Sequence, residues 1–295
     1  MTKTLEGLVL RCVGGFYYVE AADAVYTCRA RGSFRREGLT PLAGDRVVIS
    51  VPSAGDGVLE KVLERRNALV RPPVANVDLM VLVASVREPA TNTLVLDKMI
   101  AVAEKKEICP IIVINKTDLA DPSELLHVYQ CAGFECFVVC AHQPETLEPL
   151  RRRLAGHVSV FTGNSGVGKS SILNGIDPTL VLETGEISQK LGRGRHTTRT
   201  ASLYRMADGY LVDTPGFSSL DMDMVESFTK DELPDCFREF SPYVGHCRFA
   251  GCAHYREPDC AVQHAVETGE IARSRYDSYV TMYEAVKDKK EWEKP

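Results

Sequence analysis

Residues 163–170 constrain the fold of this chain more than any other stretch, because they fit the pattern G-x-x-x-x-G-K-[ST]. The apolar run 158–161 before them predicts a short buried strand, and residues 171–174 after them predict the first turn of a helix. Strand, glycine-rich loop and helix in this order form a P-loop, whose backbone N–H groups surround phosphate oxygens at the positive end of the helix. We therefore expect a bound nucleotide, with Lys169 reaching its β- and γ-phosphates and Ser170 holding Mg²⁺.

Strands and helices alternate on the amino-terminal side of this loop. Residues 77–84, 110–114 and 137–139 are nearly continuous apolar runs, as in parallel strands that are buried on both faces. Between the first two, residues 93–107 carry apolar side chains at helical spacing. The alternation predicts a parallel α/β sheet around the P-loop.

Residues 115–118 fit the pattern N-K-x-D and lie directly after one of these predicted strands. The carboxylate of Asp118 can accept the N1–H and N2–H donors of guanine, whereas adenine offers no such pair and would leave the carboxylate unpaired. Asn115 is expected to tie neighbouring loops together, and the stem of Lys116 to cover the base. The nucleotide is therefore predicted to be GTP or GDP.

Residues 213–216 fit the pattern D-x-x-G at the end of another predicted strand, 210–212. Asp213 would contact Mg²⁺ through water. The N–H of Gly216 would sense the γ-phosphate, so that loss of this phosphate releases the loop. A nucleotide-dependent switch is therefore expected here.

Two further segments are expected to complete the site. Thr197 or Thr198 is the switch threonine that closes on Mg²⁺ and the γ-phosphate; we favour Thr198, with Ser170 as the second Mg²⁺ ligand. Residues 140–142 follow a predicted strand where a loop that contacts the base is expected, although Cys-Ala-His departs from the usual Ser-Ala-Lys. The predicted nucleotide contacts are Asn115, Lys116, Thr117, Asp118, Gly163, Asn164, Ser165, Gly166, Val167, Gly168, Lys169, Ser170, Ser171, Asp213 and Gly216.

The guanine motif comes before the P-loop, whereas ordinary small GTPases run in the order P-loop, switch threonine, D-x-x-G and N-K-x-D. Loops of a parallel sheet gather at the carboxyl ends of the strands whatever their chain order, so a circularly permuted chain can assemble the same site. Here the D-x-x-G loop continues through residues 217–226 directly into the C-terminal region. We hypothesise that the nucleotide state moves that region.

Hydrolysis is predicted to be slow in the absence of a partner. Ras-like GTPases place a water-orienting Gln directly after D-x-x-G, but this chain has Phe217, whose phenyl ring cannot orient water. His196, in the basic stretch 191–199, is the nearest alternative; a structural or RNA-contacting role for it stays equally open. The candidate catalytic residues are His196, Thr198 and Lys169.

Three cysteines and a histidine cluster late in the chain: Cys247, Cys252, His254 and Cys260. In a cytosolic protein such clustering favours a metal over disulfides. Three thiolates and one imidazole make a closed tetrahedral site for a structural Zn²⁺, with no position open for catalytic water. The alternative is a group of free buried thiols.

The N-terminal part has a different sequence pattern from the residues around the P-loop. Residues 5–62 contain several short apolar segments separated by turn residues, which predicts a small β-barrel. Its loop 29–36 holds four Arg and one Phe, a composition that suits RNA contact but also an ordinary solvated loop. Residues 65–67 and 71–73 predict a linker stiffened by prolines.

The net charge of −5 does not by itself indicate nucleic-acid binding, although basic patches at residues 29–36, at 193–199 and at Arg273 and Arg275 are compatible with RNA contact. No apolar run approaches the roughly 18–20 residues that span a bilayer, and residues 1–7 lack the apolar core of a signal peptide. We therefore expect a cytoplasmic protein without a membrane partner. A monomer is the default expectation, with no motif behind it.

Permuted guanine and phosphate motifs, an N-terminal barrel and a Cys-Cys-His-Cys cluster occur together in one family. The chain resembles the RsgA family, the ribosome small subunit-dependent GTPases, over nearly its whole length. The resemblance implies a multidomain α/β protein, with an OB-fold barrel in residues 1–66, a circularly permuted P-loop GTPase domain in 67–226 and a helical zinc-binding domain in 227–295.

The resemblance also implies a function. Members of the family are late-acting assembly factors of the 30S ribosomal subunit that bind 16S rRNA. The subunit stimulates their GTP hydrolysis, which is coupled to release of the factor. They have a hydrophobic residue in the place of Phe217, and a switch-region His in the place of His196 is implicated in hydrolysis.

Two other functions are open to the sequence. The first is a nucleotide-gated RNA- or ribosome-binding module whose hydrolysis is incidental, which Phe217 favours. The second is a P-loop ATPase or kinase that acts on small molecules, which Asp118 disfavours. Turnover of GTP with and without small subunits separates the first of these from an assembly GTPase.

Overall fold

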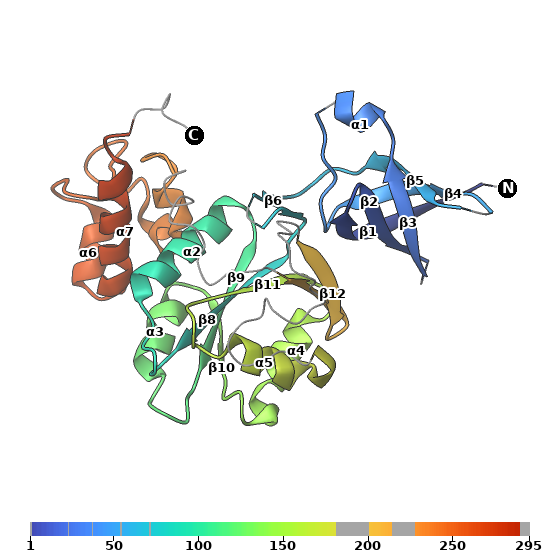
Figure 1. The fold of residues 1–295 in the computed structure, drawn as a ribbon. Coiled ribbons are helices and arrows are strands. Elements are labelled where there is room, and N and C mark those ends of the chain that lie inside the picture. The colour runs from blue at the N-terminus through green and yellow to red at the C-terminus, as the bar shows by residue number, and fades with distance from the viewer. Residues whose placement is uncertain are drawn as a thin grey trace.

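A computed structural model describes residues 2–22, 24–36, 38–53, 55–70, 72–180, 201–213 and 228–289. Figure 1 shows three parts: a β-barrel at the N-terminal end, a central sheet flanked by helices, and a group of helices near the C-terminus. The barrel and the C-terminal helices attach to opposite sides of the central part.

Five strands form the barrel in the described part of the chain: β1 (Lys3–Val13), β2 (Phe16–Ala21), β3 (Ala24–Ala30), β4 (Arg46–Val51) and β5 (Gly57–Val62). They lie in the order β1-β2-β3-β5-β4, and β4 pairs back with β1, so the sheet closes. A short helix, α1 (Ser33–Arg36), connects β3 to β4. Val9, Val19, Val47 and Leu59 meet inside the barrel and exclude water. The small barrel predicted from the sequence is confirmed, and it has the five-stranded form of an OB-fold.

The central sheet has the order β10-β9-β8-β11-β13-β12. Its members are β8 (Leu79–Ser85), β9 (Cys109–Asn115), β10 (Glu135–Val138), β11 (Val158–Thr162), β12 (Ser202–Met206) and β13 (Gly209–Asp213). The first five in this order are parallel, and β12 joins β13 as an antiparallel hairpin. The hairpin turns at Ala207 and Asp208, whose φ angles of 50° and 60° suit the tight turns that match strand twist. The predicted parallel sheet is confirmed.

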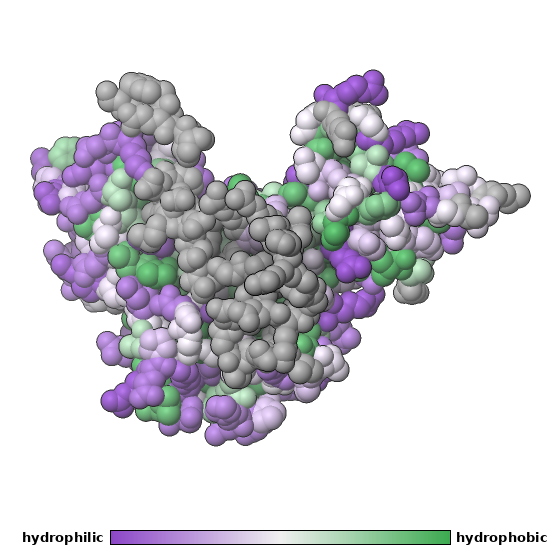
Figure 2. Space-filling view, viewed as in Figure 1, coloured by the Kyte–Doolittle hydropathy of each residue, from purple (hydrophilic) through white to green (hydrophobic). Residues whose placement is uncertain are grey.

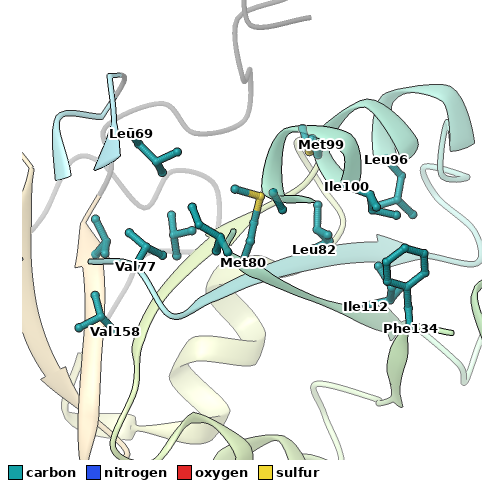
Figure 3. Packing of buried hydrophobic residues seen from close by; sticks show 14 of the residues in the cluster. Leu69, Val77, Met80, Leu82, Leu96, Met99, Ile100, Ile112, Phe134 and Val158 are labelled. Atoms are coloured by element: carbon teal, nitrogen blue, oxygen red, sulfur yellow. The ribbon is translucent and has the colours of Figure 1, made fainter. Parts of the chain in front are cut away.

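Helices cover both faces of this sheet: α2 (Thr93–Lys105) and α3 (Ser123–Cys131) on one, α4 (Glu148–Leu154) and α5 (Lys169–Ile176) on the other. Successive residues of a strand point to opposite faces. Met80 and Leu82 of β8 therefore join the core under α2 and α3, whereas Leu79, Val81 and Val83 join the core under α4 and α5. Figure 3 shows Met80 and Leu82 facing the side chains of α2. Burial on both faces explains the unbroken apolar run.

The C-terminal part consists of short 3₁₀ helices, η4 (Pro234–Cys236) and η5 (Arg238–Tyr243), followed by α6 (Ala261–Glu267) and α7 (Arg273–Val286). Its apolar core contains Phe237, Phe240 and Tyr279, and it is shared with Ala101 and Val102 of α2. The helical pattern predicted after residue 226 is confirmed for α7. One outer face of α2 thus serves as the docking surface for the C-terminal helices.

The stretch between the barrel and the sheet is more ordered than the predicted linker. It contains a two-stranded hairpin of β6 (Ala68–Leu69) and β7 (Val74–Ala75). Asn67 exchanges two hydrogen bonds of 2.9 Å with the backbone of Val77, and the amide of Asn76 donates to Gly44 O at 2.9 Å. At Gly44 a Cβ would lie 2.0 Å from Ala75 O, so only glycine allows this approach. The barrel is therefore held by a hydrogen-bonded joint.

A second contact joins the barrel to the edge of the central sheet. Strand β1 pairs with β12 at Arg11 and Ser202, so all eleven strands of the described ranges outside the β6–β7 hairpin form one continuous sheet. The carboxylate of Glu20 in β2 accepts hydrogen bonds from Arg205, at 2.9 Å, and from the hydroxyl of Tyr210. The β1–β12 pairing and the hydrogen bonds of Glu20 therefore both join the barrel to the β12–β13 hairpin.

In the space-filling view the barrel and the C-terminal helices stand apart as two lobes, each with many hydrophilic side chains (Figure 2). Across the described ranges, no helix combines the length and apolarity that a membrane span needs.

Candidate nucleotide site and metal site

The P-loop follows β11 and ends where α5 begins at Lys169. Gly163, Gly166 and Gly168 have φ angles of 139°, 82° and 97°, which side chains rarely adopt. A Cβ on Gly163 would lie 2.2 Å from Val83 O, and one on Gly168 would lie 2.2 Å from Asn115 Nδ2. Glycine is therefore needed at these positions, both to adopt the positive φ angles and to avoid clashes with neighbouring atoms. The order of strand, loop and helix is as predicted.

Lys169 lies inside the loop. Its ammonium donates to Gly163 O at 2.6 Å and to Asn164 O at 2.9 Å. Burial lowers the pKa of Lys169 to about 8, because the charged form is poorly solvated there. Phosphate oxygens placed in the loop would meet this ammonium. Ser170 and Ser171, in the first turn of α5, are half-buried beside it.

Asn115 connects three loops at the carboxyl edge of the sheet. It ends β9 and is 2% exposed. Its amide donates to Val167 O in the P-loop at 2.9 Å, and its Oδ1 accepts from the N–H of Ala141 at 3.1 Å. The guanine motif, the P-loop and the Cys-Ala-His loop, which are far apart in the chain, are brought together by this one side chain.

The rest of the guanine motif continues from Asn115. Lys116 has a φ of 62°, and its ammonium donates to Glu88 O. Thr117 Oγ1 donates to Val139 O at 3.2 Å. The Asp118 side chain is exposed, and its Oδ1 accepts from the thiol of Cys140 at 3.4 Å. Residues 115–118 and 140–142 therefore form one hydrogen-bonded unit.

Sequence reasoning missed the loop that follows β8. Because β8 lies between β9 and β11, this loop reaches the same edge as the guanine motif and the P-loop. Glu88 supplies the carbonyl that binds Lys116, and a Cβ on Gly166 would lie 3.2 Å from Pro89 Cδ. No short motif marks this loop; only the strand order reveals it.

Several predicted site residues lie wholly or partly outside the described residues. Asp213 ends β13 at the same edge of the sheet, but its side chain is outside the described part of the structure. The residues of both switch stretches also lie outside the described residues: His196, Thr197, Thr198, Gly216 and Phe217.

The predicted metal ligands come together in the C-terminal part. The ligand atoms of Cys247, Cys252, His254 and Cys260 all lie within 4.8 Å of one another. His254 Nδ1 is 3.5 Å from Cys247 Sγ and 3.4 Å from Cys260 Sγ, and these two sulfurs are 3.9 Å apart. Tetrahedral Zn²⁺ with Zn–S bonds of about 2.3 Å places its ligands about 3.8 Å apart. The donor set therefore fits one tetrahedral ion.

Helix α7 supports the loop that carries these ligands. Tyr276 donates its hydroxyl hydrogen bond to the carbonyl of His254 at 3.0 Å, and Tyr279 donates to the carbonyl of Ala253. Burial raises the pKa of the Cys252 thiol to about 12 and lowers the pKa of His254. The neutral imidazole of His254 is the form that binds a metal, and a bound cation would stabilise the thiolate form of Cys252.

One predicted RNA patch is wrong in part. Arg275 is 1% exposed and makes ion pairs with Asp97 and Glu239, so it is unavailable to RNA. Arg273 is exposed and pairs with Asp277. On the barrel, Arg29 is exposed and lies 4.4 Å from the ring centroid of Phe16.

Two family models and several curated proteins match this chain. The family model described as RsgA GTPase matches residues 62–223, and the RsgA N-terminal domain model matches residues 6–59. The small ribosomal subunit biogenesis GTPase RsgA of Geobacillus kaustophilus is 45% identical over 291 residues, which are 97% of this chain and 98% of that protein. Its counterpart in Caldanaerobacter subterraneus is 43% identical over 97% of both chains.

Two solved structures share the fold. YloQ, described as a circularly permuted GTPase, is 35% identical with a TM-score of 0.82, covering 98% of this chain and 96% of YloQ. YjeQ from Thermotoga maritima is 37% identical with a TM-score of 0.82, covering 98% of this chain and all of YjeQ.

Proposed function

This chain belongs to the RsgA GTPase family, and we propose that it binds and hydrolyses GTP as an assembly factor of the small ribosomal subunit. The observation that carries the nucleotide part is the position of Asn115, which holds the guanine motif, the P-loop and the Cys-Ala-His loop at one edge. The ribosomal part rests on relatives that are named for small-subunit biogenesis.

The proposed chemistry is transfer of the γ-phosphoryl group of GTP to water. Lys169 supplies positive charge to the β- and γ-phosphates, and the backbone N–H groups of residues 163–168 position them. Asp118 recognises the guanine base, and Asn115, Lys116 and Thr117 hold that base in place. Mg²⁺ would be held by Ser170, Thr198 and Asp213 and would offset charge on the phosphates.

Water positioning is assigned to His196 in this proposal, since Phe217 cannot do it. Gly216 is assigned to sensing the γ-phosphate. The variant His196→Ala tests the first assignment: subunit-stimulated turnover is expected to fall while GDP affinity stays unchanged. Full stimulated turnover in this variant would return His196 to a structural or RNA-contacting role.

We further propose that Cys247, Cys252, His254 and Cys260 hold one structural Zn²⁺. The tetrahedral spacing of their donor atoms supports this. All four positions are taken by protein ligands, so the ion would organise the loop and α6 without chemistry of its own.

The proposed partners are the 30S subunit and its 16S rRNA. Exposed arginines stacked on aromatic rings, Arg29 on Phe16 and Arg11 on Tyr18, suit contact with RNA bases and phosphates. The proposal includes a cytoplasmic monomer and a division into a barrel (1–66), a GTPase domain (67–226) and a zinc-binding domain (227–295).

The nucleotide-dependent movement of the C-terminal region also stays a proposal. Because α7 is fixed to α2, such a movement has to carry α2 with it or break the contact of Arg275 with Asp97. Small-angle scattering with GDP and with a non-hydrolysable GTP analogue tests this. Identical scattering curves would contradict it.

GTP turnover titrated with 30S subunits at a stated salt concentration tests the proposed function as a whole. Slow intrinsic turnover that rises with added subunits is expected, with ATP turned over at background level. No stimulation would refute the assembly role and favour a binding module whose hydrolysis is incidental.

A further inference from the structure

The thiol of Cys140 faces the carboxylate of Asp118. Cys140 follows β10, in the loop that Asn115 connects to the P-loop. Its Sγ lies 3.4 Å from Asp118 Oδ1, with the thiol as donor and the carboxylate as acceptor. In the described part of the chain this is the one hydrogen bond that the Asp118 side chain receives.

The position of the thiol is fixed by its surroundings. The Cys140 side chain is buried, and its backbone N–H donates to Thr146 Oγ1 at 3.0 Å. The same hydroxyl lies 3.1 Å from Cys140 O and 2.7 Å from Gln143 O, and the next residue, Ala141, donates to Asn115. These contacts hold the backbone on both sides of Cys140, and burial restricts the side chain that this backbone carries.

Asp118 is in the opposite situation, because its side chain is exposed. An exposed carboxylate samples several rotamers, and ordering it on ligand binding costs free energy. A carboxylate that receives N1–H and N2–H of guanine together has to be held in the plane of the base. A bond from a buried, fixed donor restricts the rotamers to those in which Oδ1 faces Cys140.

We infer that Cys140 is a positioning residue for guanine recognition, which orients the Asp118 carboxylate through its thiol. The inference rests on the proposed guanine site. A thiol is a weak donor, so the bond is longer than a hydroxyl–carboxylate bond of about 2.6 Å. Replacing the thiol by a hydroxyl preserves or strengthens the orientation, and removing it abolishes the orientation.

Paired measurements with GDP and IDP separate orientation from simple loop damage. Inosine lacks the N2 amine, so it can give the carboxylate only one of the two donors. Dissociation constants for both nucleotides, measured on the full-length protein by competition with a fluorescent GDP, give a GDP-over-IDP preference. The phosphates and ribose are the same, so their contribution cancels in that ratio.

Cys140→Ala is expected to weaken GDP binding about fivefold, as for loss of one modest hydrogen bond, and IDP binding less. The preference for GDP therefore falls. Cys140→Ser restores both the affinity and the preference. Cys136→Ala is the matched control, because Cys136 lies on β10 but its thiol donates to Phe134 O at 3.4 Å; its preference stays that of the wild type.

The outcomes are distinguishable. Equal weakening of GDP and IDP by Cys140→Ala, or no change in either, overturns the positioning role while guanine recognition stands. Failure of Cys140→Ser to restore the preference also overturns it. If the wild-type protein binds ADP as tightly as GDP, the proposed guanine site itself fails.

Discussion

Arg275 of α7 and Asp97 of α2 form an ion pair of 2.7 Å from which solvent is almost completely excluded. Arg275 also binds Glu239 at 2.6 Å and 3.1 Å, and Tyr129 of α3 donates to Asp97 at 3.0 Å. Phe237 lies against the guanidinium, with its ring centroid 4.7 Å away. Three separate segments therefore meet around one arginine.

Arg275→Met is expected to destabilise the protein by about 3–5 kcal/mol, because it leaves the buried carboxylates of Asp97 and Glu239 without a cation. Urea unfolding followed by circular dichroism measures this, and limited proteolysis shows whether the C-terminal helices detach first. Arg273→Met, at an exposed ion pair two residues away, is the control and should change stability by less than about 0.5 kcal/mol. Equal effects of the two substitutions would contradict the anchoring role.

Nucleotide affinity should fall as pH rises above about 8. Burial lowers the pKa of Lys169 from 10.5 to about 8 in the free protein, and bound phosphates favour the charged ammonium and raise it again. Below this range Lys169 is already charged and affinity is flat; above it, binding has to take up a proton, which costs about tenfold in affinity per pH unit. The phosphates themselves titrate at about pH 6, outside this window.

Calorimetry of GDP binding in two buffers of different ionisation heat measures the proton uptake directly. About half a proton per site is expected at pH 8. Lys169→Met is the control, since it binds more weakly and should show no proton uptake in this range. Buffer-independent heats for the wild-type protein would show that Lys169 stays charged throughout.

Asn115→Ala should weaken GDP binding by about ten- to a hundredfold, because it releases Val167 O and the N–H of Ala141 together. The matched control is Asn76→Ala, another buried asparagine with two backbone contacts, at Gly44 and Arg66 in the barrel joint. Both variants should lose about 1–3 kcal/mol of stability. Only Asn115→Ala should lose affinity; a similar loss in the control would assign the effect to general destabilisation.

Removal of the metal should loosen the C-terminal helices. The wild-type protein is expected to contain about one zinc ion per chain by mass spectrometry, and Co²⁺ in its place should give the intense absorption of a tetrahedral thiolate site. Cys252→Ser should lose the ion and on the order of 3 kcal/mol of stability. Cys131→Ser, at an exposed thiol on α3, is the control and keeps the ion. Full metal content in Cys252→Ser would contradict the ligand assignment.

The nucleotide loops could be predicted because each motif is short, contiguous and placed at a strand end. The short sequence patterns of residues 115–118 and 163–170 are enough to indicate their chemistry. Because parallel strands present their loops at one edge of the sheet, the two motifs can be predicted to lie together. The same rule, applied to β8, would have found Glu88 and its contact with Lys116.

Contacts between distant side chains could not be predicted in this way. Arg275 looked like a surface cation because arginine is usually exposed, and nothing local indicates that Asp97, 178 positions earlier, is buried beside it. The joint between barrel and sheet was likewise predicted only as a stiff linker, because the partners of Asn67 and Asn76 are backbone atoms.

The strand order of the central sheet has a consequence for synthesis of the chain. Ribosomes make β8, β9 and β10 in succession, and these can pair at once, but β8 lies between β9 and β11. Asp78 and Val158, which flank that second pairing, are 80 positions apart. Until β11 emerges, β8, whose seven residues are all buried in the folded protein, has an open edge, which is the condition under which nascent chains aggregate. The hydrogen bond between Glu20 of the barrel and Tyr210 forms later still, since the two residues are 190 positions apart.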